Sequence, residues 1–205
     1  HVTNSSFFGN EALTGNGGAI HMARDSILHI FNSTIIKNKA LILHGGAIGV
    51  WYRSSLFMYT CIVDGNEALN GGGIDSRGKS LLNIYNSTFQ NNKALDIDGG
   101  AIYVRDNSNI SMYTCIVNRN KAKTSGGALF LTEDSIMHVT NSLFFGNEAI
   151  ISNGGAFYLR NSKLYMYSCI TNGNSAKVKG GGMYFENGIM YGYNSTFIEN
   201  EAYAD

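Results

Sequence analysis

Three cysteines recur at a fixed interval, and thiols can bind a metal, attack a substrate or form disulfides. Cys61, Cys115 and Cys169 are each 54 residues apart. A reactive or metal-binding thiol needs partners at its own site, usually histidine or further cysteines. Serine, and never histidine, stands at the matching place in the repeats between the cysteines. We therefore expect small thiols that face inward, with no metal site and no cofactor.

Paired carboxylates offer a second kind of chemistry, the general acid and base catalysis of enzymes that cleave polysaccharides. Only Asp106, Glu133 and Asp134 put acidic residues on neighbouring turns of the repeat, and those turns are rich in Ser and Asn. The pattern contains no evident pair of acids at a catalytic spacing. We expect no enzymatic activity, and keep a carbohydrate-binding or polysaccharide-cleaving protein as the alternative.

Aromatic residues form two regular series that are suited to binding. The first series, interrupted only by Thr140, consists of Phe31, Tyr59, Tyr85, Tyr113, Tyr167 and Tyr193. The second series consists of Tyr103, Phe130, Tyr158 and Tyr184. Aromatic pairs across strands contribute only ~0.2–1 kcal/mol each, whereas a long exposed apolar stripe usually marks an interaction surface. Both series are expected to face outward, either for stacking alone or for contact with another chain or a glycan.

Asn-x-Ser/Thr sequons are a candidate for covalent modification. They begin at Asn109, Asn4, Asn32, Asn86 and Asn194. We expect Asn109 on an accessible turn, and the other four at a strand-end corner with inward-facing side chains. An intact mass equal to the bare 22.3 kDa chain would reject glycosylation.

The elements that position these residues follow from an internal repeat. Asn-x-Ala occurs eight times, at successive spacings of 26 to 28 residues. Its asparagines are Asn10, Asn38, Asn66, Asn92, Asn120, Asn147, Asn174 and Asn200. A Gly-Gly-(Ala/Gly)-apolar unit keeps the same interval. So little drift leaves no room for a second domain, and residues 1–205 are predicted to form a single repeat array.

Within each repeat, apolar residues alternate with others over short stretches bounded by Gly and Asn, which indicates half-buried strands. No repeat has helical periodicity, and about 27 residues are too few for a propeller blade. The sequence therefore predicts an all-β protein, a parallel β-helix of about 7.5 coils with 26–28 residues each. The pattern does not give the hand of the helix, and we expect a right-handed one because the coils are longer than a hexapeptide. Like residues would stack ~4.8 Å apart.

The stacked columns carry further predictions. We expect two strands per coil to supply an apolar core, as in Leu82 and Ile84, with a third apolar column at the turn before each repeated Asn. The Asn are expected to form an amide ladder while adopting the left-handed conformation themselves. The glycine pairs would provide positive φ or close backbone approach.

Cysteines that lie two coils apart are separated by ~9.6 Å and cannot form disulfides. The charges after the Asn mostly alternate and would pair across coils.

The paired GGA(I/L/V) and FxxN motifs resemble the repeats of the polymorphic outer-membrane protein family of chlamydial autotransporter adhesins. GGAI stands at Gly17, Gly45 and Gly99, and FxxN at positions such as Phe7–Asn10 and Phe89–Asn92. The resemblance implies a surface-exposed, right-handed β-helical passenger that adheres. Within residues 1–205 we expect no C-terminal membrane barrel of the autotransporter type.

Net charge and the length of apolar runs argue against two classes of partner, nucleic acids and membranes. The 15 basic and 15 acidic residues give a net charge of 0, which argues against nucleic-acid binding. No apolar run approaches the ~18 residues of a membrane span. We expect an extracellular or cell-surface rod, a segment of a longer solenoid, since the chain opens at His1 without a signal-peptide pattern. Its expected partners are its own copies, in filaments or homo-oligomers, or a surface glycan or receptor.

Overall fold

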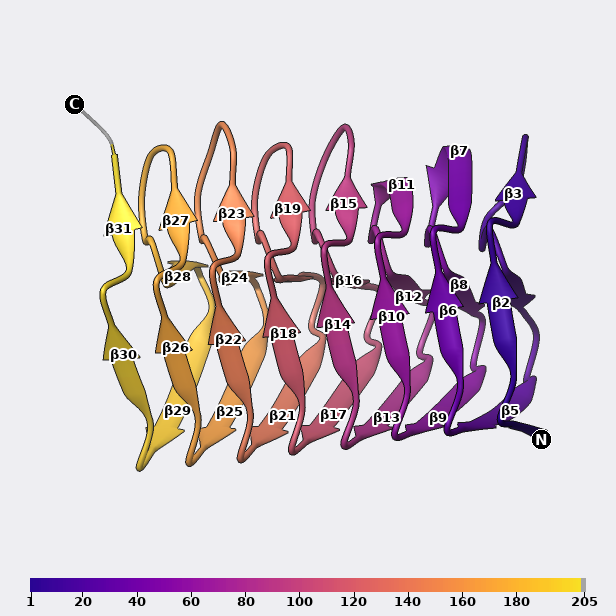
Figure 1. The fold of residues 1–205 in the computed structure, drawn as a ribbon. Coiled ribbons are helices and arrows are strands. Elements are labelled where there is room, and N and C mark those ends of the chain that lie inside the picture. The colour runs from indigo at the N-terminus through magenta and orange to yellow at the C-terminus, as the bar shows by residue number, and fades with distance from the viewer. Residues whose placement is uncertain (204–205) are drawn as a thin grey trace.

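The computed structural model describes residues 1–203, in which all regular structure is β. Each coil is wound from short strands, and each strand pairs in parallel with the strands one coil before and after it (Figure 1). The predicted parallel β-helix is confirmed. The coil differs in detail from the prediction, because a full coil contributes strands to four sheets rather than two.

We call the four sheets A to D. Sheet A contains β1 (Val2–Thr3), β5 (Ile27–Phe31), β9 (Ser55–Tyr59), β13 (Leu81–Tyr85), β17 (Asn109–Tyr113), β21 (Ile136–Thr140), β25 (Lys163–Tyr167) and β29 (Ile189–Tyr193). Sheet B contains β2 (Ser6–Phe8), β6 (Thr34–Ile36), β10 (Ile62–Asp64), β14 (Thr88–Gln90), β18 (Ile116–Asn118), β22 (Leu143–Phe145), β26 (Ile170–Asn172) and β30 (Thr196–Ile198). Sheet C contains β3 (Glu11–Ala12), β7 (Lys39–His44), β11 (Glu67–Asn70), β15 (Lys93–Ala94), β19 (Lys121–Ala122), β23 (Glu148–Ala149), β27 (Ser175–Ala176) and β31 (Glu201–Ala202). Sheet D contains β4 (Ile20–Met22), β8 (Ile48–Trp51), β12 (Ile74–Arg77), β16 (Ile102–Val104), β20 (Leu129–Leu131), β24 (Phe157–Arg160) and β28 (Met183–Glu186).

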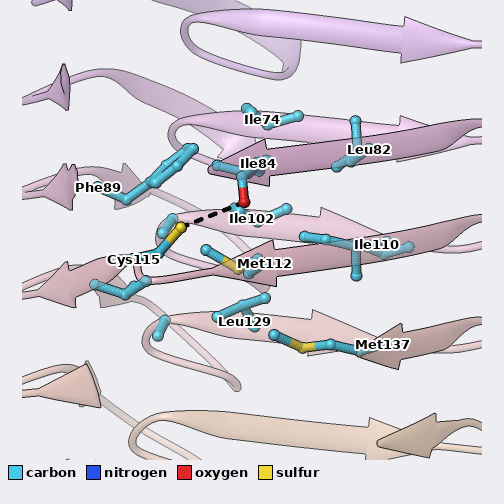
Figure 2. Close-up of a cluster of buried hydrophobic side chains, with 14 of the residues drawn as sticks. Ile74, Leu82, Ile84, Phe89, Ile102, Ile110, Met112, Cys115, Leu129 and Met137 are labelled. Carbon is cyan, nitrogen blue, oxygen red and sulfur yellow. Dashed lines mark hydrogen bonds between the residues drawn. The ribbon is translucent and has the colours of Figure 1, made fainter. Parts of the chain in front are cut away.

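The register stacks like residues, as the repeat predicts. Leu82 pairs with Leu56 on one side and Ile110 on the other. These side chains, with those of sheets B and D, fill a continuous buried core along the axis (Figure 2). The third apolar column, which includes Phe89, lies in the sheet B strands and not in a turn. The turn prediction was wrong because these strands have only three residues, too few for a visible alternation.

The predicted asparagine ladder is present and faces inward. The side chain of Asn120 is fully buried, and its Nδ2 donates to Oδ1 of Asn147 and to the carbonyl of Phe89, both at 3.0 Å. Its Oδ1 accepts from the amide and the Nδ2 of Asn92, at 3.0 and 2.9 Å. The left-handed residue is the one before each ladder Asn, such as Arg119 with φ 53°, and not the Asn itself. That turn aims the amide into the coil, which corrects the prediction.

The two glycines of each pair do different work. Gly45 has φ 70°, a conformation that favours glycine. At Gly46 a Cβ would lie 2.6 Å from the amide nitrogen of Glu67 in the next coil. The pair therefore combines one left-handed turn with one close approach between coils, as predicted.

Candidate interaction surface

The first aromatic series forms one column on the outer face of sheet A, which we call the sheet A column. Register pairs Phe31 with Tyr59, Tyr59 with Tyr85, and Tyr85 with Tyr113. Their ring centroids are 4.9, 4.9 and 5.2 Å apart, with planes within 7° of parallel. The strands fix this spacing, since neighbouring β-strands lie ≈ 4.7–4.9 Å apart.

The rings of this column are increasingly exposed toward the last coil. Tyr59 and Tyr85 are partly buried, whereas Tyr113, Tyr167 and Tyr193 are 38, 50 and 66% exposed. Burial between its neighbours, and then their like charge when ionised, raises the pKa of Tyr85. The column is thus a strip of stacked rings whose edges contact solvent, and in the later coils the rings are more exposed. The prediction that the first series faces outward is confirmed.

A second column on the same face was missed by the sequence reasoning. It lies two residues earlier on each strand and includes His29, Phe57, His138, Tyr165 and Tyr191. His29 stacks on Phe57 at 4.5 Å, and Tyr165 on Tyr191 at 5.0 Å. Five-residue strands have more than one outward position, so the period-2 alternation could have revealed it.

A cavity of about 460 Å³ lies between these two columns in the later coils. It is lined by Tyr113, His138, Val139, Thr140, Tyr165, Met166, Tyr167, Tyr191, Gly192 and Tyr193. The lining contains no Asp, Glu, Lys or Arg. It combines aromatic faces with hydroxyl groups, which suits an uncharged partner that has both apolar and hydrogen-bonding surface.

The second aromatic series is not an exposed surface, and that prediction was wrong. Tyr103, Phe130 and Tyr158 stack on the outer face of sheet D with centroids 5.2 and 4.7 Å apart. They are only 8, 2 and 8% exposed, and Tyr184 packs against them. Burial raises the pKa of Tyr103 to about 12.

The loops that lead from sheet C into sheet D lie beside this column. Gly49 occupies the same column in an earlier coil. If it carried a Cβ atom, that atom would lie 3.5 Å from the Asn16 side chain, which belongs to the first of these loops. Half-buried Asp98, in a later loop, accepts from the Ser125 amide at 2.9 Å, and burial raises its pKa. The covered aromatic series therefore forms a small satellite core.

The same outer face of sheet D holds a buried polar cluster in the earlier coils, which the sequence reasoning also missed. Asp75 is fully buried, and Nε and Nη2 of Arg77 donate to its two oxygens at 2.8 and 2.6 Å. The Trp51 indole donates to Asp75 at 2.6 Å, and the Arg77 guanidinium lies 4.2 Å from the Trp51 ring. Burial lowers the pKa of both His21 and His44 beside this cluster.

The acidic residues on neighbouring turns do come together. The neighbouring carboxyl group of Asp106 raises the pKa of Glu133. Arg105 lies 3.7 Å from Asp106. Within residues 1–203, no group of three or more His, Cys, Asp or Glu is placed to hold a metal ion.

The three cysteines are buried where the chain turns from sheet A into sheet B. The thiol of Cys115 points to the carbonyl oxygen of Ile84 at 3.6 Å (Figure 2) and to that of Tyr113 at 3.4 Å. Burial raises the pKa of Cys115 to about 11, and burial also raises those of Cys61 and Cys169. All three are free thiols that face inward, as predicted.

Four of the sequon asparagines point outward, contrary to the expectation of inward side chains. They occupy the left-handed corner between sheets A and B, with φ between 48° and 50°, and are exposed: Asn4, Asn32, Asn86 and Asn194. The following residue, such as Ser33, takes the inward place. The fifth, Asn109, is exposed as expected but begins β17 instead of lying in a turn.

The charged residues after the ladder Asn stack in register along sheet C. Glu67 lies 3.3 Å from Lys39 and 3.5 Å from Lys93, and Lys121 lies 2.7 Å from Glu148. Lys93 and Lys121 are the expected like-charged neighbours. The predicted cross-coil pairing is confirmed, and such partly exposed pairs contribute about 0–1 kcal/mol each.

Comparison with known families finds two matches. Residues 18–202 match the family described as the right handed beta helix region. Residues 4–22 match the Chlamydia polymorphic membrane protein repeat, which confirms the resemblance seen in the motifs. Neither the curated proteins nor the solved structures give a significant match. Among residues 1–203 no helix is long and apolar enough to cross a membrane.

Proposed function

The chain belongs to the right handed beta helix region family, and we propose that it is a non-enzymatic rod at the cell surface or outside the cell that adheres through the outer face of sheet A. The repeat match at residues 4–22, to a membrane protein of Chlamydia, supports the surface location. The partner is a surface glycan, a receptor or a second copy of the rod.

The observation that carries this proposal is the exposed aromatic strip of sheet A. When a ring stacks on its neighbours, only its faces are covered and its edge stays in solvent. Of the rings in this strip, Tyr113, Tyr167 and Tyr193 are 38 to 66% exposed. Exposed apolar strips of this length usually mark interaction sites. The core, the Asn ladder and the buried sheet D aromatics account for stability without these rings.

The test removes two rings of the strip. In the Tyr85→Ser, Tyr113→Ser double variant we expect at least a tenfold loss of binding to immobilised copies of the same protein or to a printed panel of neutral and acidic glycans. The matched control is Ile62→Ser with Ile116→Ser, which removes two exposed apolar residues from sheet B. Equal binding by the wild type and the sheet A variant would reject the proposal.

Polysaccharide cleavage is the second candidate, favoured by the Asp106–Glu133 carboxyl pair alone. A raised pKa at Glu133 is a property of general acids. Depolymerisation of a neutral or acidic polysaccharide that Glu133→Gln abolishes would establish this activity. If product release is absent, or is unchanged in Glu133→Gln, the adhesive proposal is favoured.

A further inference from the structure

One ring is missing from the sheet A column. Register places Thr140 between Tyr113 and Tyr167, where every coil from the second to the eighth otherwise carries an aromatic residue. Adjacent strands are ≈ 4.7–4.9 Å apart, so the two flanking tyrosines are separated by two steps, about 9.6 Å. The short threonine leaves a gap one ring wide, which we call the Thr140 slot.

The slot differs from the rest of the column because it offers free ring faces. Tyr85 is held between Tyr59 and Tyr113, at 4.9 and 5.2 Å, so no further ring can enter there. Tyr113 and Tyr167 each have a stacked neighbour on one side only, and are 38 and 50% exposed. A flat group about as thick as one ring can stack on both of them at once.

Polar groups surround this apolar gap. Thr140 lies at its base, and exposed Asn141 follows at the corner of the coil. His138 lies beside it in the second column, stacked on Tyr165 at 4.6 Å. The slot belongs to the cavity of about 460 Å³ whose lining contains no Asp, Glu, Lys or Arg.

We propose that the Thr140 slot binds one pyranose ring of a neutral glycan. A pyranose has C–H faces that stack on aromatic rings and a rim of hydroxyls that matches the threonine, asparagine and histidine groups. A lining without Asp, Glu, Lys or Arg offers no carboxylate, ammonium or guanidinium group to pair with a uronate or amino sugar. The sheet A rings of a second copy do not suit the slot, since they are mostly stacked and not free to project. This inference rests on the proposed adhesive role of sheet A and adds the class of ligand.

The experiment fills the slot. Wild-type protein is titrated calorimetrically with cellohexaose and N-acetylchitohexaose, and with hexagalacturonate as the acidic comparison. We expect binding of at least one neutral oligosaccharide and a loss of at least tenfold in Thr140→Tyr, whose added ring completes the column. The control is Thr88→Tyr, an outward threonine of sheet B between Ile62 and Ile116. It adds the same ring elsewhere and should bind like the wild type.

Two further variants separate a site from a fold effect. Tyr167→Ser removes one wall and should weaken binding. Tyr52→Ser removes an exposed tyrosine that lies outside sheet A, between β8 and β9, and should not weaken it. The slot is rejected if no neutral oligosaccharide binds, if hexagalacturonate binds better, or if Thr140→Tyr binds like the wild type. Should Thr140→Tyr keep full adhesion while the Tyr85→Ser, Tyr113→Ser variant loses it, the proposed function stands and the slot alone fails.

Discussion

At the scale of single residues, the same outward position meets very different surroundings on different sheets. Tyr113 in sheet A is 38% exposed, whereas Tyr103 in sheet D is 8% exposed. Exposed His21 and half-buried His44 lie beside Asp75 and Arg77, and partial desolvation lowers the pKa of each. Titration of these histidines therefore affects stability.

We expect the protein to lose stability as the pH falls below about 6.5, the ordinary pKa of histidine. The unfolded chain takes up protons there, while partial loss of solvent around His21 and His44 makes them resist protonation in the fold, so acid favours unfolding. Above that pH both states are neutral at these sites and their contribution is constant. Urea unfolding at pH 7.5 and 5.5 measures the difference. The double variant His21→Gln, His44→Gln should show a smaller decrease, and an unchanged decrease would contradict the assignment.

At the scale of elements, each coil is held to the next by hydrogen bonds between stacked side chains and by close backbone contacts. The Asn ladder joins side chain to side chain and side chain to backbone inside the coil, and the Gly pairs let the backbones approach. Since a polar group left buried without a partner costs about 1–3 kcal/mol, each ladder position is sensitive to substitution. The outer face of sheet D adds a buried ion pair to this scheme.

Asn120→Ala should destabilise the fold by roughly 3 kcal/mol, because the Asn92 amide and Nδ2 lose their acceptor inside the core. Asn10→Ala, in the first coil, removes a side chain that is exposed, and should cost much less. Chemical denaturation of both variants provides the comparison. Equal losses would show that the buried hydrogen bonds do not set the stability of the ladder.

Asp75→Ala should cost about 3–5 kcal/mol, since it leaves the Arg77 guanidinium buried without its carboxylate. The Trp51 indole loses its acceptor at the same time, so its fluorescence emission should also change. Asp25→Ala is the matched control, because Asp25 makes the same two-bond contact with Arg53 in solvent. Denaturation of the two variants should give a clearly larger loss for Asp75, and similar losses would contradict the burial argument.

At the scale of the whole molecule, the repeat period was sufficient to predict the coil, the register and most core columns. Each wrong prediction concerned a feature that the period does not encode. Alternation shows that Tyr103 faces out of the coil but not that it is buried there, with Phe130 stacked on it and the Arg105 guanidinium 6.0 Å from its ring. Likewise, sequence spacing did not show that Asn32 points outward while Ser33 points inward, because that depends on the left-handed corner.

For the proposed assembly of this chain into filaments, in-register stacking of ends would place Glu201 of one copy beside Glu11 of the next. Like charges at that junction oppose stacking and are screened by salt. We expect electron micrographs at high protein concentration to show longer filaments for Glu11→Lys than for the wild type, and longer wild-type filaments in high salt. Dispersed short rods under all these conditions would reject end stacking and favour lateral contact through sheet A.

The alternation of serine and cysteine at the corner between sheets A and B returns every two coils, at 54-residue intervals. Recombination between two gene segments offset by this length would add or delete a pair of coils in frame. At the new junction each residue would again stack on a residue of the same column, and the loops would keep their sequences. Selection could thus adjust the length of such a rod, and the number of surface sites it displays, in single genetic steps.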